Sequence, residues 1–245
     1  MSRAAPDPTP LPGPLPDLAA GSRRRVLAPF ALALPFLLLV PPVGLLSLAV
    51  GVFSLYFYRD PEREPAGEGV LAPADGHVSV IREDGDRVRV GVFMSPFDVH
   101  VCRAPADGAV TRLDHRGAAH RPAFAKESER NERFEYTLRA GDADGSTGGG
   151  ADADGGEVIA GDGPEAVAVD DDDRTDGALI AGWFARRISP YVSRGDALSR
   201  GDRLGYIAFG SRADVVLPPA YDVDDFRVSR REAVRAGETV IARRE

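Results

Sequence analysis

The chain has 245 residues, a formal net charge of −8 and a single cysteine, Cys102, so an internal disulfide is excluded. Of its 30 basic residues only Lys126 is a lysine, and the sequence shows no basic face with interleaved aromatic residues, which argues against nucleic-acid binding. An acidic, lysine-poor chain suits a high-salt cytoplasm, where excess charge keeps proteins soluble.

The N-terminal part predicts a tail followed by a membrane segment. Residues 1–25 are rich in Pro, Ala and Asp and end in three arginines, so we interpret them as a disordered tail with a basic end. Residues 26–58 contain no charged residue, which indicates membrane association. Pro41 and Pro42 interrupt this run, and we therefore expect a hairpin of two short helices, with one tilted span as the alternative.

A hairpin would place the arginines on both sides of the apolar run on one side of the bilayer. The positive-inside rule assigns that side to the cytoplasm. We therefore expect the protein at the cell membrane, on its cytoplasmic face.

Residues 59–245 predict one mainly β domain, a compact barrel or sandwich. Short apolar runs alternate there with turns formed by Gly, Pro and Asp. Strands are expected around 69–80, 88–94, 99–102, 134–138, 178–188 and 226–243. The sequence Ala-Pro-Ala-Asp-Gly at 72–76 recurs at 104–108, which favours a quasi-repeated β fold.

An acidic stretch interrupts this domain at residues 141–176. It contains twelve Asp or Glu residues and one Arg, and we expect a disordered, solvated insertion. Its Asp-Ala-Asp-Gly pieces are similar to calcium loops, but Gly163 stands where a loop starting at Asp152 would need its bidentate glutamate.

Gly210 and Ser211 separate two apolar runs, 204–209 and 215–217, in the pattern strand, tight turn, strand. A strained glycine peptide followed by a hydroxyl is a geometry for attack on the chain's own backbone. An ordinary Gly-Ser turn is the alternative.

Five stretches together resemble the phosphatidylserine decarboxylase proenzyme family, in its short bacterial and archaeal type. They follow the family order and are residues 58–61, 72–76, 93–100, 131–133 and 209–212. The resemblance implies self-cleavage between Gly210 and Ser211 into fragments 1–210 and 211–245. It also implies that Ser211 becomes a covalent pyruvoyl group, so that neither an external cofactor nor a metal is needed.

The same resemblance implies the reaction and its substrate. A serine phospholipid, phosphatidylserine or archaetidylserine, would form a Schiff base with the pyruvoyl group, lose CO2 and leave as the ethanolamine lipid. The acidic composition favours a haloarchaeal owner and hence archaetidylserine. The partners are then the lipid, the membrane and the two cleavage fragments, and the sequence leaves a homo-oligomer open.

Asp75 and His100 match the aspartate and histidine that assist catalysis in the family. Longer-type members carry a second histidine three residues after the first, where this chain has Arg103. The base that activates Ser211 therefore stays open between His100, Asp75 alone, and an approach of His115 or His120. The arginines considered for the lipid phosphate are Arg59, Arg63, Arg186 and Arg187.

Three other functions were weighed on the sequence. A non-enzymatic, membrane-anchored β module of lipoyl or biotinyl type would need a lysine at a hairpin tip, but Lys126 lies in a polar stretch. A pyridoxal phosphate enzyme would need a phosphate-binding loop beside that lysine. A metal enzyme could draw on His100, Cys102, His115 and His120, but their spacing matches no recognised ligand pattern.

Overall fold

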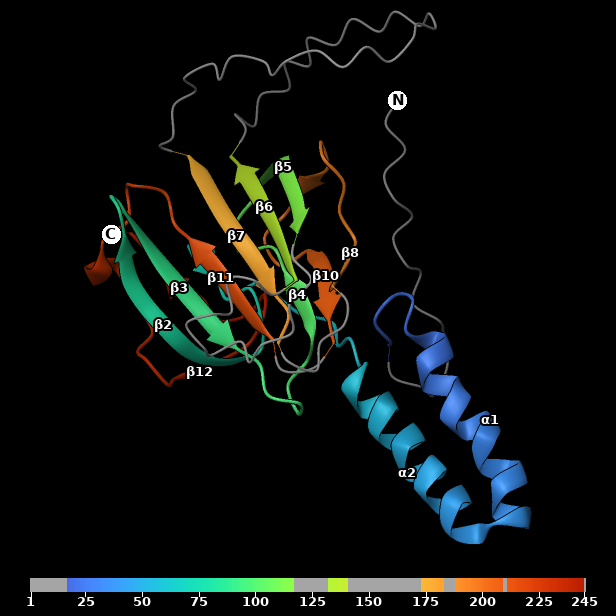
Figure 1. Cartoon of the computed structure of the whole chain (residues 1–245). Coiled ribbons are helices and arrows are strands. Elements are labelled where there is room, and N and C mark those ends of the chain that lie inside the picture. Colours follow the sequence, from blue (N-terminus) through green and yellow to red (C-terminus); the bar gives the residue numbers. More distant parts are fainter. Residues whose placement is uncertain (1–16, 117–131, 141–172, 183–187, 209–210, 245) are drawn as a thin grey trace, which may run out of the picture.

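The computed structural model describes residues 17–116, 132–140, 173–182, 188–208 and 211–244. It is mainly β, as predicted, with two helices that project from one end of the β domain (Figure 1). The helices are α1 (Arg23–Leu39) and α2 (Pro41–Phe57). The strands are β1 (Val70–Leu71), β2 (Gly76–Asp84), β3 (Arg87–Phe93), β4 (Val101–Arg103), β5 (Gly108–Arg116), β6 (Arg133–Arg139), β7 (Arg174–Ile180), β8 (Ile188–Pro190), β9 (Ala197–Leu198), β10 (Arg203–Ile207), β11 (Arg212–Val216), β12 (Ala233–Val234) and β13 (Val240–Ala242).

Eight antiparallel strands form one sheet in the order β12-β2-β3-β11-β7-β6-β5-β9. This sheet curls into an open half-barrel (Figure 1). A three-stranded sheet (β4-β10-β8) and a two-stranded sheet (β1-β13) complete the β domain. β11 is central in the large sheet, because it pairs with β3 on one side and with β7 on the other.

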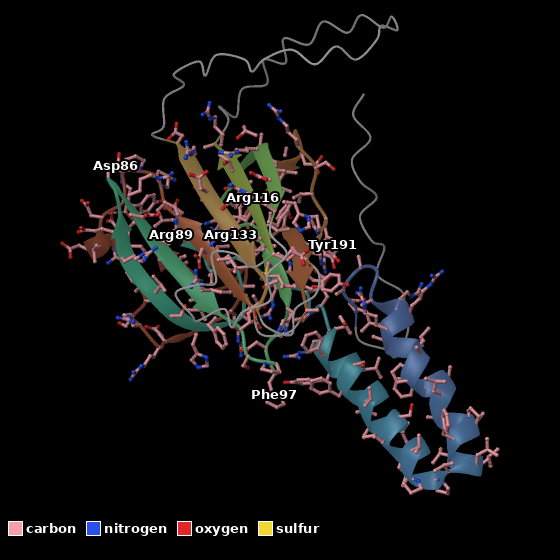
Figure 2. The ribbon with its side chains drawn as sticks, in the orientation of Figure 1. Asp86, Arg89, Phe97, Arg116, Arg133 and Tyr191 are labelled. Atoms are coloured by element: carbon pink, nitrogen blue, oxygen red, sulfur yellow. The ribbon has the colours of Figure 1, made fainter. Side chains whose placement is uncertain are left out.

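The two faces of the large sheet differ because side chains alternate along each strand. In β3, Val88, Val90 and Val92 are buried in the core. Arg87 and Arg89 alternate with them and form ion pairs, Arg87 with Asp176 (2.6 Å) and Arg89 with Asp214 (3.3 Å). Figure 2 shows Arg89 and Arg133 on this charged face.

The sequence repeat is also a structural repeat. Gly76 and Gly108 begin β2 and β5 with φ of +137° and +155°, which only glycine adopts readily. The turns before them exchange equivalent hydrogen bonds, since Leu71 N–H donates to Pro105 O (2.8 Å) and Arg103 N–H donates to Pro73 O (2.9 Å). The repeat therefore holds at the two turns and at the strands that begin there, and a quasi-repeated fold stays a prediction.

The apolar segment forms two helices of 17 residues each, joined at Val40. Pro41 begins α2, where the missing N–H of proline has no intrahelical partner to lose. The alternative of a single tilted span is therefore wrong. No helix in the described part of the chain is long and apolar enough to cross a membrane.

The predicted boundaries of the tail and of the acidic insertion need correction. Leu18 forms a β-bridge with Arg59, and Ala19 and Ser22 are buried, so the end of the tail packs on the protein and α1 begins at Arg23. β7 begins at Arg174, so the last residues of the predicted insertion belong to a strand that pairs with β6 and β11. Residues 1–16 and 141–172, including the calcium-like pieces, lie outside the described residues.

Candidate active site

Ser211 lies directly before β11, at the end of the large sheet where this central strand begins. Its side chain is fully buried, its carbonyl accepts a hydrogen bond from Met94 N–H (2.9 Å), and its Oγ lies 3.6 Å from Met94 Sδ. The predicted strands on both sides are confirmed, but β10 and β11 belong to different sheets. The peptide predicted to be cut therefore lies where the chain passes from one sheet to the other, and Gly210 is outside the described residues.

Asp75 lies at the same end of the large sheet, in the turn before β2, which is separated from β11 by β3. A Cβ on Gly76 would stand 2.1 Å from Phe93 O, so the absence of a side chain allows this turn to pack against the end of β3. The Asp75 carboxylate accepts hydrogen bonds from the Arg63 guanidinium (2.8 and 3.1 Å) and from Ala236 N–H (2.8 Å). Burial raises the pKa of Asp75, and the two hydrogen-bond donors and the Arg63 charge offset part of that rise.

His100 lies before β4 and is 2 % exposed. Its Nδ1–H donates to Asp98 O (2.9 Å), which leaves the lone pair on Nε2, and Nε2 is buried with no hydrogen-bond partner in the described structure. The ring packs on Phe57, with centroids 4.3 Å apart. Burial lowers the pKa of His100 to about 4, so the imidazole is neutral at pH 7 and can accept a proton at Nε2.

The fold brings the three predicted residues to the same end of the β domain. Asp75 and Ser211 lie at the ends of β2 and β11, on either side of β3, and the His100 carbonyl accepts a hydrogen bond from Ile207 N–H (3.1 Å), four residues before Ser211. Within the described residues, however, Ser211 Oγ is not hydrogen-bonded to Asp75 or to His100. Of the two, His100 has the unoccupied acceptor, because Asp75 is engaged by Arg63 and Ala236.

Arg103, at the position of the family's second histidine, is buried and has a structural role. Its guanidinium donates to Gly201 O (2.9 Å), Pro61 O (2.9 Å) and the Asp60 carboxylate (3.1 Å). Arginine stays protonated even here, although burial lowers its pKa. Arg103 therefore cannot take a proton from Ser211, and it fixes the linker after α2 on the β domain instead.

Of the other two candidate histidines, the structure describes His115, which is paired with Glu132. His115 Nε2 lies 2.9 Å from the Glu132 carboxylate, which also accepts a hydrogen bond from Ile188 N–H (3.1 Å). The Cys102 thiol is buried and burial raises its pKa, so it is not a thiolate. No group of three or more potential metal ligands occurs among the described residues. His120, Lys126, Arg186 and Arg187 lie outside them.

The family model described as phosphatidylserine decarboxylase matches residues 50–148 and 172–242 of this chain. The chain belongs to the phosphatidylserine decarboxylase family. The match skips residues 149–171, which lie within the acidic stretch, and it includes Asp75, His100 and Ser211.

Relatives within the phosphatidylserine decarboxylase family cover most of the chain. A Halobacterium salinarum protein named "Putative archaetidylserine decarboxylase proenzyme" is 46% identical over 221 residues, 90% of this chain and 95% of its own length. A Streptomyces avermitilis "Phosphatidylserine decarboxylase proenzyme" is 42% identical over 182 residues, 73% of this chain and 68% of its own length. A Methanopyrus kandleri protein with the same name as the first is 33% identical over 92% of this chain and 98% of its own length. No solved structure gives a significant match.

Sequence reasoning within this family missed two roles that the structure makes visible. The sequence suggests Arg63 as a ligand of the lipid phosphate, but its side chain is only 7% exposed and forms ion pairs with Asp75 and Glu238. Asp60 received no role, although it is paired with Arg103 (3.1 Å) and Arg203 (2.6 Å). The signal that points to Asp60 is Arg103 itself, because an arginine in a buried position requires an acidic partner.

Proposed function

We propose that this chain is a self-processing decarboxylase that converts a serine phospholipid into the ethanolamine phospholipid and CO2. The observation that carries the proposal is a fully buried Ser211 at the end of the large sheet that also holds Asp75. A neutral His100 with a free Nε2 lies at the same end of the β domain, and the chain is a member of the phosphatidylserine decarboxylase family. We set the lipoyl-like alternative aside, because the relatives of this chain are named as decarboxylase proenzymes.

The self-cleavage step needs a base near the Ser211 hydroxyl. Ser211 Oγ attacks the Gly210 carbonyl as its proton moves to a base, and the amide becomes an ester with a free Ser211 amine. A base then removes the Cα proton of residue 211 as the Cβ–Oγ bond breaks, which frees the Gly210 carboxylate and leaves a dehydroalanine. Its imine tautomer adds water, releases ammonia and leaves a pyruvoyl group on fragment 211–245. His100 is the proposed base, since its Nε2 lone pair is unoccupied.

The pyruvoyl group fits the position of Ser211, which is buried and starts a strand that is paired on both sides. Once formed, the group would supply a carbonyl that condenses with the substrate amine and withdraws electrons while CO2 leaves, and water would then release the ethanolamine lipid. Each decarboxylation consumes one proton, which His100 would take up from solvent at Nε2 and deliver to the substrate carbon. The burial of His100 keeps water away from that transfer.

The experiment that tests the proposal is an intact mass of purified protein beside a Ser211→Ala control. The wild type should give two fragments, with a pyruvoyl group in place of Ser211, and the control should give one chain of 26.1 kDa. CO2 release from serine phospholipid should then depend on cleavage. A wild-type chain that stays uncut in high salt with membrane lipid present would refute the proposal.

We also infer that the helical hairpin anchors the protein in the cytoplasmic leaflet. α1 begins and α2 ends at the β domain, and the tip that joins them is rich in exposed apolar side chains, with Leu38 81% and Leu39 77% exposed. Insertion tip first would leave the active-site end at the lipid surface. Replacing Leu39 by Asp should abolish flotation with anionic liposomes, whereas Val223→Asp, at an exposed apolar position of the β domain, should not.

The lipid class is the last part of the proposal. The H. salinarum relative carries archaetidylserine in its name, and the acidic, lysine-poor composition agrees with that class. We infer that the ether lipid is the substrate. Side-by-side assays with archaetidylserine and phosphatidylserine test this, and exclusive turnover of the diacyl lipid would overturn it.

A further inference from the structure

One face of α2 carries a shallow apolar groove that is largely open to solvent, and nothing in the described structure covers it. It has a volume of about 600 Å3 and is lined by Leu45, Leu48, Ala49, Val52, Phe53 and Tyr56. These positions follow the helical spacing of three and four residues, so they form one continuous stripe along the helix. Val52 is 57% exposed and Tyr56 is 46% exposed, which leaves a large apolar area for a ligand to cover.

Arg59 lies where this groove reaches the β domain. Its guanidinium is 3.9 Å from the centre of the Tyr56 ring and donates hydrogen bonds to Tyr56 O (2.7 Å) and to Phe97 O (2.8 Å). Tyr56 OH also donates to Phe97 O (3.0 Å), and Figure 2 shows Phe97 beside the last turn of α2. The Arg59 side chain is therefore held in one place by neutral partners.

The charge of Arg59 has no acidic partner among the described residues, in contrast to Arg63. Arg63 is 7% exposed at its side chain and pairs with Asp75 (2.8 Å) and Glu238 (3.1 Å). Two carbonyls and an aromatic ring orient the Arg59 guanidinium without neutralising it. A partly exposed guanidinium of this kind is suited to bind a phosphate oxygen.

The groove on α2 leads to Arg59, which follows the end of the helix, and His100 packs on the last residue of the helix. Phe57, the last residue of α2, packs on the His100 ring (4.3 Å between centroids), and the charge of Arg59 acts on His100. In a serine phospholipid the order is the same, because the phosphate joins the hydrocarbon chains through the glycerol and the amine-bearing carbon through one CH2 group.

We propose that the α2 groove holds one hydrocarbon chain of the substrate lipid and that Arg59 binds its phosphodiester. This inference rests on the proposed decarboxylase function and adds the lipid-binding residues to it. Arg59 and the groove then set the affinity for the substrate and place its amine toward His100 and Ser211.

The test compares two substrates with processed enzyme in neutral detergent micelles, which removes any need to bind a bilayer. The substrates are a long-chain serine phospholipid and its deacylated head group, glycerophosphoserine. Arg59→Gln should raise the KM for both substrates about 10- to 100-fold, as expected for the loss of a charge-assisted hydrogen bond, and Arg59→Lys should restore part of the affinity. Val52→Glu should raise the KM for the long-chain lipid alone.

Val50→Glu is the matched control, because Val50 is 46% exposed on the same helix and does not line the groove. Its KM for both substrates should stay at the wild-type value. The inference is overturned if Arg59→Gln lowers kcat at unchanged KM, if Val50→Glu and Val52→Glu behave alike, or if Val52→Glu impairs glycerophosphoserine equally. Failure of the proposed function is a separate result, since the wild type would then stay uncut or release no CO2.

Discussion

Removal of the Arg63 charge is expected to slow self-cleavage, although Arg63 touches neither Gly210 nor Ser211 in the described structure. The Arg63 and Asp75 side chains are 7% and 13% exposed and 2.8 Å apart, and Arg63 also pairs with Glu238. Arg63→Met keeps an unbranched apolar stem but removes the guanidinium, and it leaves Asp75 without its counterion. Breaking a buried ion pair in this way costs about 3–5 kcal/mol of folding free energy.

The sign of the pH effect follows from the pKa of Asp75. Burial already raises that pKa, so the folded state binds a proton more tightly than the unfolded chain does. The stability that this proton provides is complete below the unfolded pKa and is lost as the pH rises through the folded pKa. Without Arg63 the folded pKa rises further, and the loss of stability should therefore be larger at pH 8 than at pH 5.

The stability measurement uses the Ser211→Ala background, so that only uncut chains are compared by denaturant unfolding. The cleavage measurement follows the two fragments by mass over time in newly synthesised protein, at temperatures where the variant is folded. If Asp75 must be ionised to assist cleavage, the rate for Arg63→Met at pH 7 should fall and the acid limb of its pH profile should shift to higher pH.

Arg235→Met is the matched control, because Arg235 faces the same Glu238 carboxylate from the surface, at 3.6 Å and with 73% of its side chain exposed. A surface pair contributes about 0–1 kcal/mol, so this variant should resemble the wild type. A folded Arg63→Met variant that cleaves at the wild-type rate with an unchanged pH profile would refute the reasoning.

Three further predictions follow from the same geometry. His100→Gln should fold but cleave itself about 10²–10⁴-fold more slowly than the wild type. In the wild type, the self-cleavage rate should fall only as the pH approaches about 4, where His100 becomes protonated. Timed mass analysis across pH measures both effects. After cleavage the fragments should co-elute in native gel filtration and separate only in denaturant, because β11 pairs on both sides with strands of the larger fragment; separation in buffer would contradict this. Gly76→Ala should lower the free energy of unfolding, measured with denaturant, by more than about 3 kcal/mol, because its Cβ would stand 2.1 Å from Phe93 O. Gly85→Ala has open space around it and should lower that free energy by about 1–2 kcal/mol, from backbone strain alone. Equal losses would contradict the packing argument.

Local sequence patterns predicted several of the strands but missed β5, and they could not assign the strands to sheets. Alternation and turn residues located β3, β6, β10 and β11, because side-chain period and glycine geometry are local properties. Pairing depends on contacts far apart in the chain, so the pattern around Gly210 and Ser211 did not reveal that β10 and β11 lie in different sheets. The half-barrel curl is likewise a property of eight strands together.

The candidate site was predictable as residue types but not as partners. Asp75, His100 and Ser211 were named from the sequence, and the fold places them at one end of the β domain. The contacts that set their chemistry are long-range, such as the hydrogen bond from Ala236 to Asp75 and the Phe57 ring on His100. Burial decides both pKa shifts, and no local pattern encodes burial of a polar side chain.

The internal repeat separates what the Ala-Pro-Ala-Asp-Gly turn does structurally from what it does at the active site. Asp107, the second copy of Asp75, accepts the equivalent backbone hydrogen bond, from Arg200 N–H at 2.9 Å, so this bond is part of the turn itself. Of these two aspartates, Asp75 alone forms a buried ion pair within the described chain, with Arg63, and it alone precedes a strand beside the Met94 peptide that binds Ser211. Asp107→Asn should therefore leave self-cleavage unchanged and Asp75→Asn should slow it. Equal behaviour of the two variants would mean that Asp75 acts only as a turn residue and that His100 activates Ser211 alone.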